Sequence, residues 1–186
     1  MAGIASRSFG TWRGGLRLAL SYIQVAAGIA AVRAPEPVAV RRLVFVCHGN
    51  ICRSPFGEEI ARQAGYRTAS FGLSTASGKP AHPPVAAQAA AMGHDLSAHR
   101  STALADFRAA EGDLLVAMEV RHLHRLAADP VLGAFPRVLL GSYLPVPVPH
   151  LHDPYMLAEE YLPTCLGRIE DAVRLLCRSF PAAGTS

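Results

Sequence analysis

The residues best suited to chemistry lie in the stretch LVFVCHGNICRSP, residues 43–55. Cys47 follows an apolar, β-branched run, Gly49 and Asn50 tolerate left-handed backbone, and Arg53 offers a planar fork of donors. The backbone N–H groups between Cys47 and Arg53 can curl into a concave nest, and a helix that follows adds its positive end. The segment therefore predicts a site for a tetrahedral oxyanion beside a cysteine sulfur.

The same positive field would act on the thiol of Cys47. Thiols beside cations and helix N-termini ionise more readily than free cysteine, and a hydroxyl such as that of Ser54 can donate to the sulfur. Cys47 would then be a thiolate nucleophile aimed at phosphorus. The usual alternative for a free cysteine is an inert buried thiol, and that reading leaves the neighbouring residues unexplained.

The elements that must hold this segment alternate between strand and helix. Hydrophobic runs and helix start and stop signals predict strands at 42–47, 66–72, 113–118 and 137–142, and helices at 54–64, 84–93, 119–128 and 157–180. Ser54 is the expected N-cap of the first helix, with Pro55 as its first residue, and the last helix is expected to bend at Pro163.

This alternation predicts an α/β fold: a three-layer sandwich with a four-stranded parallel sheet, helices on both faces and an N-terminal extension. In such sheets ligands bind at the carboxyl ends of the strands. Cys47 lies at the carboxyl end of the first strand, and the loop that leads to Asp153 follows the fourth. The fold therefore predicts that both side chains reach one edge of the sheet.

Residues 1–40 are predicted to form an extension that precedes a domain at 41–182. No acidic residue precedes Glu36. An expected helix is apolar except for one stripe of small or polar residues: Gly14, Arg17, Ser21, Gln24 and Gly28. Its uncharged run, 18–32, would be about 22 Å long, short of the ~30 Å hydrocarbon core of a membrane. Residues 14–33 would dock on their own domain, a partner or a membrane surface; an organellar transit peptide and a weakly selected extension are the alternatives.

Composition limits the broad class of the protein. At 186 residues, 51% hydrophobic and 17% charged, the chain suits one well-buried domain rather than disorder. Its net charge of +4 comes almost wholly from arginine, since Lys79 is the only lysine. Without a basic run or interleaved aromatics, a nucleic-acid role is not expected. Four cysteines in a chain of this size do not form a disulfide framework, which favours a reducing, cytoplasmic setting.

The run VCHGNICRSP at 46–55 resembles the signature of the low-molecular-weight protein tyrosine phosphatases, V-C-x-G-N-x-C-R-S-P. The resemblance covers about residues 42–180. Weaker matching blocks follow in the right order and spacing: SFG at 70–72, DLSAHR at 95–100, LLVAM at 114–118, LLGSY at 139–143 and DPY at 153–155.

The resemblance implies a catalytic role for three residues. Cys47 attacks the phosphoryl group and forms a phosphocysteine, Arg53 binds the phosphate and stabilises the transition state, and Asp153 acts as general acid and then base. The phosphate-binding backbone would come from His48, Gly49, Asn50, Ile51, Cys52 and Arg53. The role of Asp153 also follows from the chemistry without the resemblance, because a leaving oxygen that gains negative charge benefits from a nearby acid.

Supporting roles follow from the same resemblance. Asn50, Ser54 and Ser70 would hold the loop in shape through hydrogen bonds, and Tyr155 would face the substrate ring. Cys52 could form a protective disulfide with the nucleophile, or it could fill space under the loop. No cofactor and no metal are implied. The implied partner is a tyrosine-phosphorylated protein, such as a bacterial tyrosine autokinase or a polysaccharide-export enzyme.

Several positions depart from the family pattern. Ala98 replaces a histidine common in the animal members, and His99 follows one place later. Glu119 stands where the family usually shows Asp. The loop 73–79 lacks an aromatic residue, and Met156 replaces a second tyrosine. The cleft is therefore expected to be more open or less selective for phosphotyrosine.

Three other readings stay open. An arsenate reductase uses a related fold and loop, but the window 110–130 has no resolving cysteine, so a relay would need external thiols. A metal-dependent hydrolase would use the histidines and aspartate of two short runs, His122, His124, His150, His152 and Asp153, although solvated histidines are commoner. A dead phosphate-binding module would be expected to lose the nucleophile, the arginine or the acid, and all three are present.

Overall fold

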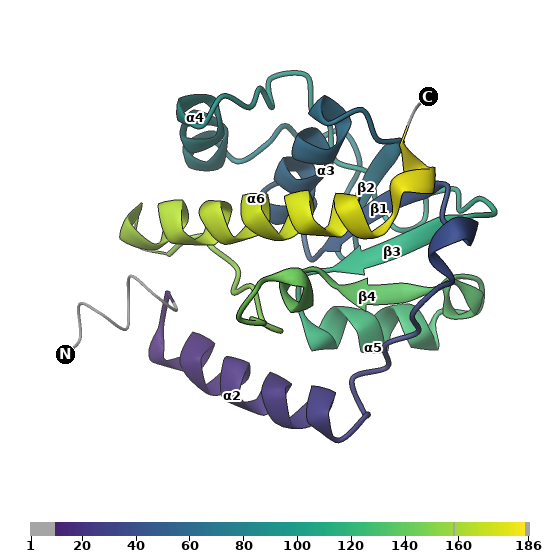
Figure 1. The fold of residues 1–186 in the computed structure, drawn as a ribbon. Coiled ribbons are helices and arrows are strands. Elements are labelled where there is room, and N and C mark those ends of the chain that lie inside the picture. Colours follow the sequence, from purple (N-terminus) through teal and green to yellow (C-terminus); the bar gives the residue numbers. More distant parts are fainter. Residues whose placement is uncertain (1–9, 158, 185–186) are drawn as a thin grey trace.

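Four parallel strands form one sheet in the computed structural model, which describes residues 10–157 and 159–184 (Figure 1). The strand order is β2-β1-β3-β4. Their bounds are Arg42–Cys47 for β1, Thr68–Gly72 for β2, Asp113–Ala117 for β3 and Arg137–Leu139 for β4. The predicted four-stranded parallel sheet is confirmed, and the first strand begins and ends at the expected residues.

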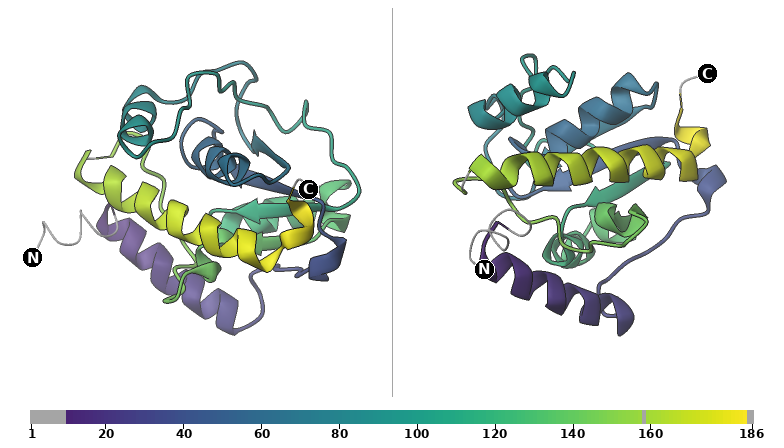
Figure 2. Two further views of the ribbon diagram at one scale, coloured as in Figure 1. Left: turned by 45° about the horizontal axis from the view of Figure 1, so that its top comes forward. Right: turned by 60° about the vertical axis from the view of Figure 1, so that its left-hand side comes forward.

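Helices cover both faces of the sheet, as predicted (Figures 1 and 2). α3 (Arg53–Gln63) and α6 (Leu162–Ser179) pack together on one face, and α4 (Pro83–Ala91) packs against α6. α5 (Val120–Ala128) lies on the other face. Short 3-10 turns complete the described elements: η1 Pro37–Ala39, η2 Leu132–Ala134, η3 Leu140–Tyr143, η4 Glu159–Tyr161 and η5 Pro181–Ala183.

Alternation along β1 divides the core into two clusters. Leu43, Phe45 and Cys47 belong to the cluster that includes α3 and α6, whereas Val44 and Val46 belong to the cluster that includes α5. All five side chains are buried. A strand buried on both faces explains why the sequence reads as one continuous apolar run.

One helix prediction and one strand prediction need correction. α6 begins at Leu162, and Pro163 lies in its first turn, so the expected bend at this proline is wrong. Pro163 is tolerated there because the first helical N–H groups have no intrahelical acceptor. The fourth strand is also shorter than expected, since the chain turns into η3 after Leu139.

The N-terminal extension contains a helix, α2 (Trp12–Ala26), that lies along the domain below β4 and α5 in Figure 1. Its buried residues, Gly14 and Ser21, belong to the predicted polar stripe. Further along, Arg33 pairs with Arg137 in an antiparallel bridge at the free edge of β4. None of the helices in residues 10–157 and 159–184 has both the length and the apolar character needed to cross a bilayer.

Candidate active site

The loop from Cys47 to Arg53 is tied to its surroundings through its carbonyl groups. Four of them accept hydrogen bonds from outside the loop, from Leu73 N to Cys47 O, Ser74 N to His48 O, His82 N to Ile51 O and His99 Nε2 to Asn50 O. Their distances are 3.0, 2.9, 2.8 and 2.7 Å. Within the described residues, the amides of Gly49, Ile51 and Cys52 donate to no acceptor. A loop whose carbonyls are bound outward leaves its N–H groups available for an anion.

Asn50 holds the turn of this loop. Its φ of +52° is in the left-handed region, and its side chain is fully buried. Nδ2 donates to Ser54 Oγ at 2.9 Å and to Ser70 Oγ at 2.7 Å, while Oδ1 accepts from Thr102 N at 2.8 Å. The structure therefore brings together the three side chains that sequence reasoning assigned to loop support. His99, whose role the sequence left open, reaches the same loop through Asn50 O.

The sulfur of Cys47 faces two donors. Ser54 Oγ lies 3.0 Å from Sγ, and the Asn50 amide donates to Sγ at 3.3 Å. Because Ser54 Oγ already accepts from Asn50 Nδ2, its own proton is free to donate to the sulfur. Two donors therefore converge on the sulfur of the predicted nucleophile.

The hydroxyl of Ser54 does not cap the helix, contrary to the expectation. α3 begins at Arg53, its N-cap position is Cys52, and no side chain caps it. The physical reason is that the Ser54 hydroxyl is committed to Cys47 and Asn50. The first-turn amides of α3 therefore have no side-chain cap.

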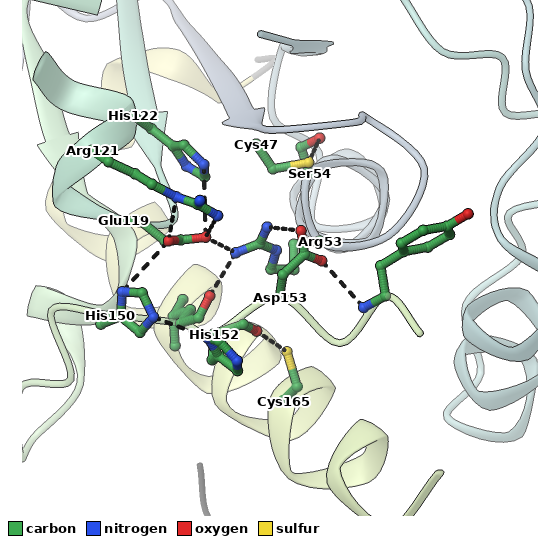
Figure 3. A network of polar contacts seen from close by, with 12 residues as sticks. Cys47, Arg53, Ser54, Glu119, Arg121, His122, His150, His152, Asp153 and Cys165 are labelled. Atoms are coloured by element: carbon green, nitrogen blue, oxygen red, sulfur yellow. Dashed lines mark hydrogen bonds and ion pairs between the residues drawn. The ribbon is translucent and has the colours of Figure 1, made fainter. Parts of the chain in front are cut away.

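Arg53 is fully buried between two carboxylates (Figure 3). Its Nη1 donates to Glu119 Oε1 at 2.6 Å and to Leu151 O at 2.7 Å. Nη2 lies 2.7 Å from Asp153 Oδ2 in an ion pair that lacks hydrogen-bond geometry. Nε and Nη2 therefore have no hydrogen-bond acceptor among the described residues. One side of the guanidinium is fixed by the protein and two donors are left for a ligand.

Glu119 is the partner of Arg53 that sequence reasoning treated only as a departure from the pattern. It is fully buried and also binds Arg121, whose Nε lies 2.7 Å from Oε2. Burial alone would raise the pKa of Glu119, but the charge of Arg53 and the hydrogen bond from Arg121 hold it well below its usual range. Glu119 therefore stays ionised and fixes the arginine. The sequence did hold one indication of this role, because Glu119 follows β3 at the carboxyl edge of the sheet, where ligands bind.

Three of the candidate metal-ligating histidines, His124, His150 and His152, have hydrogen-bond partners of their own. His150 Nε2 lies 3.1 Å from His152 Nδ1, and His124 Nε2 lies 2.8 Å from Ile29 O. Burial lowers the pKa of His150 to about 4 and that of His122 to about 3. In the part of the chain that the structure describes, no three His, Cys, Asp or Glu side chains are grouped to hold an ion. The metal reading thus gains no support from the geometry.

Asp153 and Tyr155 reach the mouth of the site. A cavity of about 190 Å³ is lined by Cys47, His48, Gly49, Ile51, Cys52, Ser74, Thr75, Lys79, Asp153 and Tyr155. Tyr155 is half exposed and meets the ring of His82 edge-on, with centroids 5.0 Å apart. Sequence reasoning missed Ser74, Thr75 and Lys79 as lining residues. Lys79, the only lysine of the chain, could have indicated that the loop after β2 lines the site. The sequence of this loop was instead compared with the family for an aromatic residue.

The other cysteines are buried. Cys52 lies under the loop, and burial raises the pKa of its thiol. Cys165 and Cys177 belong to α6, where burial raises both pKa values to about 12. All four cysteines are free in this structure. A regulatory disulfide between Cys47 and Cys52 stays a prediction.

Comparison with known proteins identifies the family. The model of the low molecular weight phosphotyrosine protein phosphatase family matches residues 42–183. The chain belongs to this family. A relative, the low molecular weight protein-tyrosine-phosphatase Etp of Escherichia coli K12, is 31% identical over 132 residues, which cover 70% of this chain and 88% of Etp. The resemblance read from the loop motif is confirmed.

Two further proteins are similar. The probable low molecular weight protein-tyrosine-phosphatase EpsP of Ralstonia nicotianae is 35% identical over 82 residues. That match covers 43% of this chain and 57% of EpsP, little more than half its length. The crystal structure of the tyrosine phosphatase Wzb from Escherichia coli K30, in complex with sulphate, has a TM-score of 0.64 and 26% identity. It covers 75% of this chain and 97% of Wzb, so the fold of this phosphatase family is shown.

Proposed function

We propose that this chain hydrolyses phosphotyrosine in proteins, with Cys47 as nucleophile, Arg53 as phosphate clamp and Asp153 as general acid and base. The observation that carries the proposal is the set of donors around Cys47 that lack a hydrogen-bond acceptor. Arg53 Nε and Nη2 and the amides of Gly49, Ile51 and Cys52 have no acceptor among the described residues. Cys52 and Arg53 are buried, where a donor without a hydrogen bond is costly, and an oxyanion would satisfy the whole set together.

The reaction follows in two steps from this arrangement. The sulfur of Cys47 attacks phosphorus, the Sγ–P bond forms, and the bond from phosphorus to the tyrosyl oxygen breaks as Asp153 protonates that oxygen. Water then attacks the phosphocysteine and gives its proton to Asp153. The Sγ–P bond breaks, which releases inorganic phosphate and restores the thiolate. The loop amides and Arg53 stabilise the charge on the equatorial oxygens in both steps.

The test measures phosphate release from p-nitrophenyl phosphate and from phosphotyrosine peptides. Cys47→Ser should abolish turnover, whereas Asp153→Ala should lower kcat by about 10²–10⁴-fold and still bind substrate. Full activity of Cys47→Ser, or loss of wild-type activity to a chelator, would contradict the proposal and favour a metal-dependent hydrolase.

Arsenate reduction is the alternative on the same fold. It needs a second thiol that attacks the sulfur of the arsenate adduct of Cys47, so that a disulfide forms as As(V) is reduced to As(III), and Cys52, Cys165 and Cys177 are all buried. We therefore expect no relay through the chain's own thiols, so any reduction of arsenate would have to draw on external thiols. A turnover with arsenate that equals the turnover with aryl phosphates would favour the reductase.

The protein partner is proposed at the level of class. A tyrosine-phosphorylated protein fits the names of the relatives, and a bacterial tyrosine autokinase or polysaccharide-export enzyme stays the narrower prediction. The division of the chain at residue 40, with an extension before a phosphatase domain at 41–182, is supported by the family match from 42 onward.

The extension is proposed to bind an anionic membrane surface through the outer face of α2. The helix packs on the domain by its polar stripe and leaves Trp12, Leu16, Leu20 and Ile23 at least half exposed. The guanidinium of Arg13 lies 5.5 Å from the ring centroid of Trp12. An apolar face flanked by arginine, with no acidic residue before Glu36, suits a surface of anionic lipids.

Vesicle flotation tests this contact. The wild-type chain should float with vesicles of equal parts phosphatidylcholine and phosphatidylglycerol, less so in high salt, and poorly with phosphatidylcholine alone. The double variant Leu16→Ser, Leu20→Ser should stay in the soluble fraction. Val131→Ser, at an exposed apolar residue outside the extension, is the matched control. No flotation, or a lipid-independent dimer that Leu16→Ser, Leu20→Ser disrupts, would overturn the proposal.

A further inference from the structure

A line of polar contacts runs from the start of α2 to the arginine of the active site. Thr11 Oγ1 lies 3.3 Å from His152 Nε2, and His152 Nδ1 lies 3.1 Å from His150 Nε2. His150 Nδ1 lies 3.6 Å from Glu119 Oε2, and Glu119 binds Arg53. Figure 3 shows the last part of this line, from His152 to Arg53. Both histidines and Glu119 are buried, so water does not compete freely for their hydrogen bonds.

The atoms allow one consistent direction of donation. Thr11 Oγ1 accepts from Gly14 N at 3.0 Å, and its own proton is free for His152 Nε2. His152 must then carry its proton on Nδ1, which faces His150 Nε2. His150 in turn carries its proton on Nδ1, which faces the carboxylate of Glu119. Burial lowers the pKa of both histidines, so each is neutral near neutral pH and has one donor and one acceptor.

The same line holds the loop that carries the general acid. His152 directly precedes Asp153, and its carbonyl lies 3.3 Å from the hydroxyl of Tyr161, which donates to it. On the other side the loop meets the extension. Tyr22 Oη donates to Pro147 O, and a Cβ added to Gly10 would lie 2.6 Å from Leu157 Cδ1. The loop is therefore enclosed between the catalytic domain and the extension.

We propose that Thr11 and His152 are positioning residues, which link the N-terminal helix through His150 and Glu119 to Arg53 and hold the loop of Asp153 over the cleft. The inference rests on the proposed function and adds a part of the chain outside the family match, which begins at residue 42. Thr11 touches neither substrate nor the reacting atoms. Its effect passes through the hydrogen bonds of His152 and the 3.6 Å polar contact between His150 and Glu119, so it depends on the hydroxyl and not on the bulk of the side chain.

A misplaced general acid, here Asp153, would change the kinetics in a recognisable way. Phenyl phosphate has a leaving group as basic as tyrosine and needs a proton, whereas p-nitrophenyl phosphate has a better leaving group and depends on the acid less. A positioning defect should therefore slow phenyl phosphate more than p-nitrophenyl phosphate. A general loss of folded protein would slow both substrates equally.

Thr11→Val in the full chain removes the hydroxyl and keeps the shape of the side chain. We expect kcat for phenyl phosphate to fall about 5- to 20-fold, with a smaller fall for p-nitrophenyl phosphate. Thr11→Ser keeps the hydroxyl and should restore both rates. Thr11→Val also removes the N-cap of α2, and Ala19→Gly controls for this, since it weakens an exposed position of the same helix to a similar extent. Ala19→Gly should leave the ratio of the two rates unchanged.

A double-mutant cycle tests whether the contacts act as one unit. His150→Phe breaks the line in its middle, so adding Thr11→Val to it should cause no further loss if both act along the same path. Additive effects, an equal fall for both substrates, or a ratio changed as much by Ala19→Gly would overturn the inference. If His150→Phe does not fold, the ratios for Thr11→Val, Thr11→Ser and Ala19→Gly decide alone. A wild-type chain inactive on both phosphates would instead refute the proposed function.

Discussion

Arg53 shows why a site of this kind recruits more than one carboxylate. Its guanidinium is fully buried, and burial alone would lower its pKa, but the charges of Asp153 and Glu119 raise it above the ordinary value. Glu119 is itself buried and needs Arg121 as a second partner. The anion site is therefore part of a charge network, in which the loss of one partner would leave a buried charge uncompensated.

Glu119→Gln tests this dependence at the residue scale. The substitution leaves Arg53 charged and buried without its fixed partner, so the free energy of unfolding should fall by about 3 kcal/mol. The value of kcat should fall as well, because Nη1 is no longer held in place. Urea unfolding and aryl phosphate turnover measure the two effects.

Glu119→Asp is the matched variant for that experiment. It keeps the charge, with a shorter reach, and places the residue type usual in the family. It should lose less stability and less activity than Glu119→Gln. Equal stability of all three proteins would mean that Arg53 does not need this carboxylate.

Sequence reasoning reached the residues with strong local signals and missed those placed by tertiary contacts. The motif around Cys47 pointed to Asn50, Ser54 and Ser70, which the structure brings together. The engagement of Glu119 with Arg53 crosses 66 residues, and nothing in its own segment reports that distance. His99 was equally undecided, because its acceptor is a backbone carbonyl 49 residues away.

At the scale of elements, the start of α3 and the end of β2 meet at the loop. Sequence patterns predicted both elements but not the contact between them. The helix starts at Arg53 rather than after Ser54, since the loop residues curl directly into its first turn. Gly72 closes β2 against the back of the loop, where a Cβ would lie 3.0 Å from the carbonyl carbon of Gly49 and 3.1 Å from Asn50 Cβ.

Gly72→Ala should therefore deform the loop. The added methyl group would also lie 2.7 Å from Thr75 Cγ2, so at least one of these segments must shift. We expect weaker inhibition by inorganic phosphate and a fall in kcat/KM of about 10-fold or more, because small displacements in such sites are costly.

Gly167→Ala is the matched control in α6. Nothing lies within 4 Å of its added Cβ, and alanine favours helix over glycine. This variant should gain about 0.5–1 kcal/mol of stability and keep its activity. Equal activity of the two variants would show that the space behind the loop is not needed.

At the scale of the whole molecule, buried neutral histidines set the response to acid. His122 is buried on α5, and both of its ring nitrogens are without hydrogen-bond partners among the described residues. Burial lowers its pKa from 6.5 to about 3. At pH values between these two pKa values, His122 is protonated in the unfolded chain and neutral in the folded chain. The free energy of unfolding should thus fall as the pH drops below 6.5.

His122→Met removes this difference in proton binding between the unfolded and folded chains. From pH 6 to pH 4.5, the slope of the unfolding free energy against pH should become smaller by about 1.4 kcal/mol per pH unit. Urea unfolding at several pH values measures the slope. His124→Met, at an exposed position of the same helix, is the matched control for the substitution itself. An unchanged slope in His122→Met would show that this ring is protonated in the folded protein.

At each edge of the sheet, another segment of the chain forms a β-bridge with the edge strand. Arg33 pairs with Arg137 beside β4, with backbone bonds of 2.9 and 2.8 Å, and Ala103 pairs with Gly72 beside β2. Open rims are templates for the strands of other molecules. A protease cut that releases Arg33 from β4 would leave the backbone groups of Arg137 without these partners and open the rim of β4 to pairing with another strand.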